Sequence, residues 1–208
     1  MSEKSFVACF FDSFRKYKYI FIFTVLLSLI VFILSWITFD TSNVAAVQEM
    51  AYVKSANPEF LSSFMAIIPN NIMMNIQSYI LSVFLGFGAF IEILNNLGMV
   101  GSISAASAAF SGDTFIFLKL TLIHALVEEI AIVINAFASF ILVYFILLFL
   151  KDSISSKESN KIKSSWEKNK IHLKYSLSVF VFALIIMFIA GILESTISIP
   201  IGNMIAGV

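Results

Sequence analysis

The stretch "FIFLKLTLIHALVEEIAIVINAFASFILVYFILLFL", residues 115–150, decides the fold class. It is an apolar run, and as a helix it is longer than the roughly 30 Å hydrocarbon core of a bilayer. Its middle contains neither Gly nor Pro, so the chain has no place to turn back within it. We therefore expect one long membrane helix that carries His124, Glu128 and Glu129 in its interior.

The composition of the whole chain indicates the same class. The sequence is 60% hydrophobic and only 12% charged, and its mean hydropathy is +0.97, which is beyond the range of soluble domains. We predict an all-α, polytopic membrane helix bundle embedded in the lipid bilayer. A phosphate-binding glycine loop, a nucleophile elbow and a nucleic-acid patch are all missing from the sequence. The single cysteine, Cys9, excludes an internal disulfide and is expected to be a small apolar filler.

Working outward from this run, we expect five membrane segments of apolar composition, at about 19–39, 72–94, 97–112, 115–150 and 175–199. The segment 97–112 is only weakly hydrophobic and is made almost wholly of small residues, so a re-entrant loop is its alternative. Gly112 and Asp113 are expected to form the turn after it. Its small residues favour close helix packing, either within one chain or in a homo-oligomer.

The distribution of charge predicts the sidedness. The N-terminal segment is basic and residues 151–174 hold seven lysines, whereas residues 40–71 hold a single lysine, Lys54. The positive-inside rule places the first two regions in the cytoplasm and the loop 40–71 outside. We therefore expect a multi-pass protein of the cell membrane with a cytoplasmic N-terminus, a cytoplasmic basic loop at 151–174 and an external C-terminus.

Helical rise then predicts the depth of the two outer carboxylates. Glu128 precedes Leu150 by twenty-two residues, which is about 33 Å of helix, and Glu194 follows Lys174 by twenty residues, which is about 30 Å. Both should lie near the external face. Asn70 and Asn71, at the outer start of the second segment, are expected to join them there.

The spacing within the long run predicts a polar stripe. His124 and Glu128 are four residues apart, and Asn135 continues the same helix face, while Glu129 points away from it. Charged groups that face lipid are costly, so we expect this stripe to face the bundle interior or a water-filled cavity. Glu92, near the inner end of the second segment, is expected to reach the interface, and pairing with a lysine of the cytoplasmic loop is the alternative.

Four short patches resemble elements of a known family and occur in its order. They are "PNNI" with Asn70 and Asn71, "LNNLGMVG" with Asn96 and Gly101, "IHALVEEIAI" with His124 and Glu128, and "AGILESTISIP" with Ala190, Gly191 and Glu194. Together they resemble the stage II sporulation protein M family of small polytopic membrane proteins, with departures at Leu97 and Ala125, where the family has glycine. The resemblance implies an integral membrane protein that, in spore formers, resembles a component of the engulfment machinery working with cell-wall hydrolases. It therefore implies membrane or cell-envelope protein partners.

Several roles remain open for the polar residues. One imidazole and two carboxylates, from His124, Glu128 and Glu194, form a plausible ligand set for a divalent metal such as zinc, iron or manganese. A metal with an open coordination position would permit hydrolysis. The same residues could instead form a hydrogen-bonded cluster that locks helices together, or an ion or proton relay of a small transporter. The resemblance favours a membrane scaffold or assembly protein, with an embedded hydrolase or a transporter as alternatives.

Overall fold

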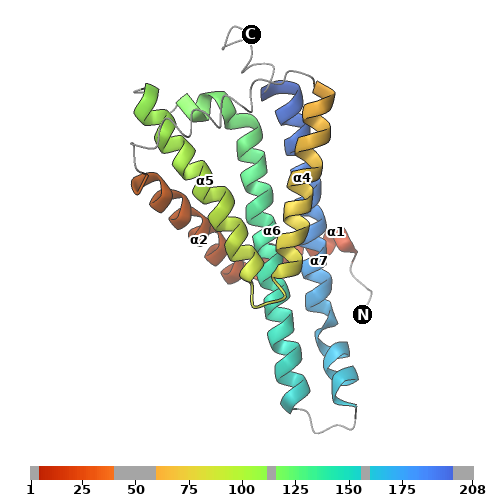
Figure 1. Ribbon diagram of the computed structural model, residues 1–208. Helices are drawn as coiled ribbons and strands as arrows, with labels where there is room; N and C mark the ends of the chain where they lie inside the picture. The colour runs from red at the N-terminus through yellow and green to blue at the C-terminus, as the bar shows by residue number, and fades with distance from the viewer. Residues whose placement is uncertain (1–4, 40–59, 112–115, 156–159, 199–208) are drawn as a thin grey trace.

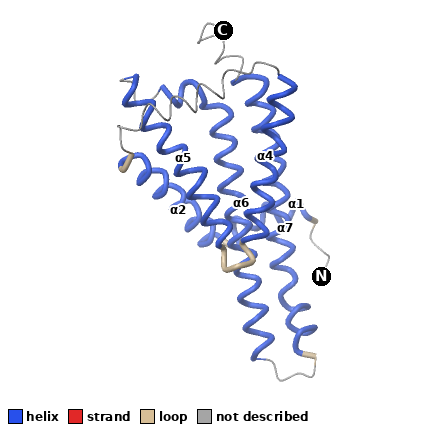
Figure 2. The backbone as a smooth tube through the Cα atoms, viewed as in Figure 1, coloured by secondary structure: helices blue, strands red, loops and turns tan. Residues whose placement is uncertain are grey.

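The computed structural model describes residues 5–39, 60–111, 116–155 and 160–198. Within these ranges every regular element is a helix and none is a strand, which confirms the all-helical prediction (Figure 2). The elements are α1 (Phe6–Lys16), α2 (Lys18–Ile37), α4 (Phe60–Leu81), α5 (Phe87–Ser111), α6 (Ile116–Ser155), α7 (Lys161–Leu193) and the π-helical turn η2 (Glu194–Ser198).

The long helices form an antiparallel bundle in which successive elements reverse direction (Figure 1). Four helical segments of the described chain are long and apolar enough to cross a membrane: Lys18–Ile37, Phe87–Ala106, Leu126–Ser155 and Lys161–Thr196. Helix α4 is of similar length but carries Pro69 and several amides, and it does not belong to that set. The count of five crossings therefore stays a prediction.

A tight turn divides the segment expected at 72–94. Helix α4 ends at Leu81 and α5 begins at Phe87, and between them Leu85 and Gly86 adopt positive φ angles of 53° and 84° (Figure 2, tan). Positive φ is accessible to glycine at little cost, and here it lets the backbone reverse. The expected single span is thus replaced by the base of a helical hairpin.

Glycine also sets how closely the two arms of this hairpin approach. A Cβ atom added to Gly88 would lie 2.0 Å from the carbonyl oxygen of Ser78, so only a residue without a side chain allows the contact. The Ser82 hydroxyl completes the turn by accepting a hydrogen bond of 2.8 Å from the backbone N–H of Ala89. The base of the α4–α5 hairpin is therefore fixed by backbone contacts.

The segment expected at 97–112 is the continuation of α5, which runs without a break to Ser111. Its small residues serve close packing within the chain, since a Cβ atom on Gly101 would lie 2.5 Å from the Phe32 carbonyl oxygen of α2. As far as Ser111 it is a regular helix, and the re-entrant alternative stays a prediction. The turn predicted at Gly112 and Asp113 lies outside the described residues.

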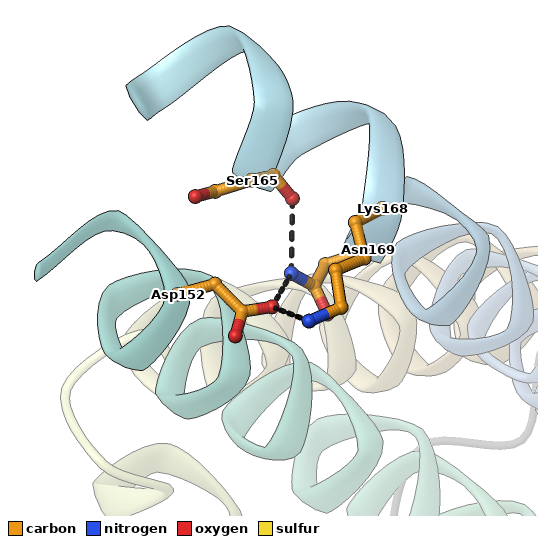
Figure 3. Close-up of polar contacts among 4 residues, drawn as sticks. All are labelled: Asp152, Ser165, Lys168 and Asn169. Atoms are coloured by element: carbon orange, nitrogen blue, oxygen red, sulfur yellow. Dashed lines mark hydrogen bonds and ion pairs between the residues drawn. The ribbon is translucent and has the colours of Figure 1, made fainter. Parts of the chain in front are cut away.

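The basic loop expected at 151–174 is largely helical. Helix α6 continues to Ser155 and α7 begins at Lys161, so the two project together beyond the α4–α5 turn (Figure 1). Asp152 holds the tip together, because its carboxylate accepts a 2.9 Å hydrogen bond from Asn169 and pairs with Lys168 at 2.9 Å (Figure 3). The seven lysines of this region suggested a loop, but a helix can also carry many lysines on its solvated face.

The N-terminal segment adds a short helix that the sequence reading did not anticipate. Ser5 caps α1 by accepting a hydrogen bond from the N–H of Ala8, and α1 packs against α7. Cys9 is fully buried in this contact, and the ring of Phe10 stacks on that of Phe182 at 4.0 Å. Helix α2, by contrast, presents a row of half-exposed aliphatic and aromatic side chains, as expected for a surface in contact with lipid.

The geometry at Gly88 yields a stability prediction. The substitution Gly88→Ala forces a methyl group into the Ser78 carbonyl, so we expect it to lower the free energy of unfolding by about 1–3 kcal/mol. Gly98→Ala is the matched control, because there the nearest atom is the movable Ser35 hydroxyl at 3.3 Å. Thermal unfolding of the detergent-solubilised variants measures both, and equal midpoints would contradict the close-contact interpretation.

Candidate functional site

Helix α4 carries a stripe of polar side chains that faces the bundle interior. Its members on α4 are Asn71, Asn75 and Ser78, spaced four and three residues apart, which places them on one helix face, and Ser82, the first residue of the turn after α4, continues the spacing. Asn75, Ser78 and Ser82 are buried and Asn71 is half-buried. From Asn71 to Ser82 the stripe extends about 16 Å along the helix axis.

At the Asn71 end of this stripe, α4 and α6 are joined through Asn71 and Glu128, two residues that were predicted to share one depth. The Asn71 amide donates a hydrogen bond of 3.1 Å to the Glu128 carboxylate. Directly below it, the Asn75 amide donates to the Asn71 carbonyl oxygen at 2.9 Å. The structure thus brings two of the predicted residues together and adds Asn75.

Deeper in the bundle, Glu92 of α5 meets Asn135 of α6. The Asn135 amide nitrogen lies 2.9 and 2.8 Å from the two Glu92 carboxylate oxygens and also donates to the Asn75 carbonyl oxygen at 3.1 Å. The Ser78 hydroxyl donates to Glu92 Oε2 at 2.6 Å. One carboxylate therefore connects α4, α5 and α6.

These contacts form one continuous hydrogen-bonded chain, which we call the polar column. It consists of Glu128, Asn71, Asn75, Asn135, Glu92, Ser78 and Ser82, linked in that order through side-chain and backbone groups. Buried polar groups that are paired in this way fix the relative position of the helices that carry them. The polar column therefore specifies how α4, α5 and α6 pack.

Glu92 corrects the sequence reading most clearly. It was expected at the interface, but only 4% of it is exposed and it lies inside the bundle. The expectation failed because the turn at 82–86 moves Glu92 into the second turn of α5, opposite Ser78. The sequence did contain a signal for this position. Asn71, Asn75 and Ser78 lie on one face of α4, and such a polar face indicates a buried polar partner.

Glu129 is a further carboxylate on α6, next to Glu128 in the chain. Its expected orientation away from the stripe of Glu128 stays a prediction, and its Oε2 atom is buried with no hydrogen-bond partner among the described residues. It lies close enough to Glu128 and Glu92 to be repelled electrostatically by both. Three carboxylates thus share the α5–α6 region, which raises the local negative potential.

The remaining predicted residues lie apart from the polar column's side chains. Asn70 is exposed, and its amide contacts the sulfur of Met74 on its own helix. Asn96 is half-buried and donates to the Glu92 carbonyl oxygen, again within its own helix. Neither side chain joins one helix to another through a hydrogen bond that the structure describes.

The three predicted metal ligands belong to α6 and η2, two elements that pack against each other. Glu194 is the first residue of η2, which packs against α4 and α6, the helices of Asn71 and Glu128. His124 belongs to α6, but its side chain lies outside the described residues. Among the described side chains no three His, Cys, Asp or Glu residues gather as a metal site would require, so the ligand set stays a prediction.

The contacts of Ser78 predict a measurable contribution from the polar column. Ser78→Ala removes a donor to the buried Glu92, and we expect the free energy of unfolding to fall by about 1–2 kcal/mol. Ser102→Ala is the control, since that hydroxyl bonds only to the Gly98 carbonyl of its own helix. Thermal melts in one detergent compare the two, and a control that is destabilised as much as Ser78→Ala would refute the assignment.

Comparison with known proteins identifies one family. The family model described as stage II sporulation protein M matches residues 19–199, which cover most of the chain. No curated protein and no solved structure matches the chain. The match extends from α2 to the end of η2 and so includes every residue of the polar column.

Proposed function

The chain belongs to the stage II sporulation protein M family, and on that premise we propose that it is an integral membrane scaffold or assembly protein. The observation that carries this proposal is the polar column. Several of its hydrogen bonds join one helix to another, which suits residues that maintain one bundle shape. A bundle of fixed shape with extended apolar surfaces is suited to holding membrane or cell-envelope proteins in place.

The proposed arrangement in the membrane has a cytoplasmic N-terminus and an external C-terminus. The antiparallel order of α4 to α7 supports it, because the α6–α7 tip and the α4–α5 turn lie toward one end of the bundle and η2 lies toward the other (Figure 1). The tip holds Lys161, Lys168 and Lys170 on exposed positions, which the positive-inside rule assigns to the cytoplasm. The Glu128 and Glu194 end is then external.

The scaffold role predicts tolerance of conservative change at the external end. Glu194→Gln keeps a side chain of the same shape that forms hydrogen bonds, so we expect it to restore the phenotype of a host strain lacking the protein. Glu194→Ala, expressed at the same level, should restore less. A Glu194→Gln protein that is folded and abundant yet inactive would instead favour the alternatives, an embedded hydrolase or an ion- or proton-coupled transporter.

We further propose that His124, Glu128 and Glu194 hold a divalent metal at this end. A metal would neutralise the two carboxylates and join α6 to η2, which would add to the stability of the scaffold. The chemistry of the donor set suits zinc, iron or manganese. As the Asn71 amide already donates to Glu128, it would act as an outer partner that orients this ligand.

The metal proposal predicts near-stoichiometric metal in the purified protein, measured by inductively coupled plasma mass spectrometry. His124→Ala and Glu194→Ala should each lose it, whereas Asn70→Ala should not, because Asn70 is exposed and contacts only its own helix. Parent protein that is folded, monodisperse and free of metal would leave the hydrogen-bonded cluster as the explanation.

A further inference from the structure

Glu92 is a buried carboxylate whose described partners are all neutral. Only 4% of the residue is exposed, and the groups that bond to it are the Ser78 hydroxyl and the Asn135 amide. Neither carries a positive charge. An ionised carboxylate in such surroundings is costly unless a positive charge or a proton compensates it.

The atoms around Glu92 include more acceptors than donors. Asn135 and Asn75 are 0% and 2% exposed, and the Oδ1 atom of each has no donor among the described residues. The Asn135 Oδ1 atom belongs to the same amide group as the nitrogen that donates to Glu92. It is therefore close to the carboxylate. A hydrogen-bond donor at Glu92 would correct this imbalance.

A rotation of one amide lets Asn135 serve either charge state of Glu92. With its nitrogen toward Glu92, Asn135 donates to an ionised carboxylate at 2.8 and 2.9 Å. Turned by half a rotation, it gives up its hydrogen bond to the Asn75 carbonyl oxygen and presents Oδ1, which accepts a hydrogen bond from a protonated carboxyl group. Ser78 donates to Glu92 in both states. The contacts to Glu92 are direct hydrogen bonds of 2.6–2.9 Å, so both states are formed by the protein's own groups and a proton.

The helices packed against α5 bring few described ionisable side chains near Glu92. Helix α2 has only Lys18 and Tyr19, at its start, and α4 has only Tyr79, whose hydroxyl bonds to Ser176 of α7. On α6, Glu129 repels a charge on Glu92. The other ionisable residues of α6 are Tyr144, Lys151 and Asp152, nine or more residues beyond Asn135, and Lys119 and His124, whose side chains lie outside the described residues. Glu128 lies farther along the polar column, where Asn71 donates to it.

From this geometry we propose that Glu92 is a reversible proton-binding site, with Asn135 as the positioning residue that turns between its two states. The proton comes from water and returns to water, and only hydrogen bonds change inside the bundle. Proton uptake removes a charge at the point where α4, α5 and α6 meet, so the packing of these helices is linked to protonation. The inference does not depend on the metal proposed at the external end.

The test is an infrared pH titration of the protein in lipid bilayers. A protonated carboxylic acid has a C=O stretching band separate from those of a carboxylate, so we expect a titrating component that Glu92→Gln lacks. Gln matches Glu in shape and still accepts from Ser78, so the variant should fold. Glu167→Gln is the control, since Glu167 is exposed on α7, and it should keep the component.

Two further spectra separate this proposal from a purely structural role. Asn135→Leu should retain the Glu92 component but move its frequency, because the carboxyl group loses its hydrogen-bond partner. If the wild-type protein shows no C=O band assigned to Glu92 at any pH, the proposal is overturned. Loss of the component at constant pH when sodium replaces choline would also overturn it, because the site would then bind a metal cation.

A chemical test on the wild-type protein needs no variant. Dicyclohexylcarbodiimide forms a stable adduct with protonated carboxyl groups in apolar surroundings, and peptide mass mapping locates it. We expect an adduct on Glu92 whose yield falls as the pH rises. A yield that does not change with pH would contradict reversible protonation.

Discussion

The structure depends on a single desolvated contact, the one between the Asn135 amide and the Glu92 carboxylate. This amide also donates to the backbone of Asn75, so three helices meet at one side chain. In a membrane, lipid is as apolar as the residues of the helix faces, and apolar burial gives little preference for one helix arrangement over another. A buried polar group that must find its partner does give such a preference.

The α4–α5 turn makes this contact possible. By reversing the chain between Ser82 and Gly86 it sets Ser78 opposite Glu92, and Gly88 lets the two backbones approach without a side chain between them. A straight helix through the same residues would have left Glu92 near one end, facing lipid headgroups. The turn and the buried carboxylate therefore form a single structural feature.

The polar column links two regions with different chemistry. Glu128 and Glu194 belong to α6 and η2, which pack together, and there we propose a metal ion. Farther along the polar column, Glu92 accepts hydrogen bonds from neutral donors, and there we propose proton binding. In the proposed scaffold, the first region adds stability and the second adjusts the helix packing. The amides of Asn71 and Asn75 lie between the two regions.

Much of this architecture is readable from the amino-acid sequence alone. Composition and run length determine an all-helical membrane protein, and the cost of exposing polar groups to lipid determines that residues such as Glu128 and Asn135 face inward. The family resemblance is readable as well, because it depends on short ordered patches. The sequence reading placed Glu92 wrongly, and it treated 151–174 as a loop where α6 and α7 continue. Only the tertiary structure decided where the chain turns and which polar groups meet. The reason is physical: helical periodicity fixes the face on which a residue lies, whereas a backbone reversal at Leu85 and Gly86 and the pairing of Glu92 with Asn135 depend on contacts between separate helices.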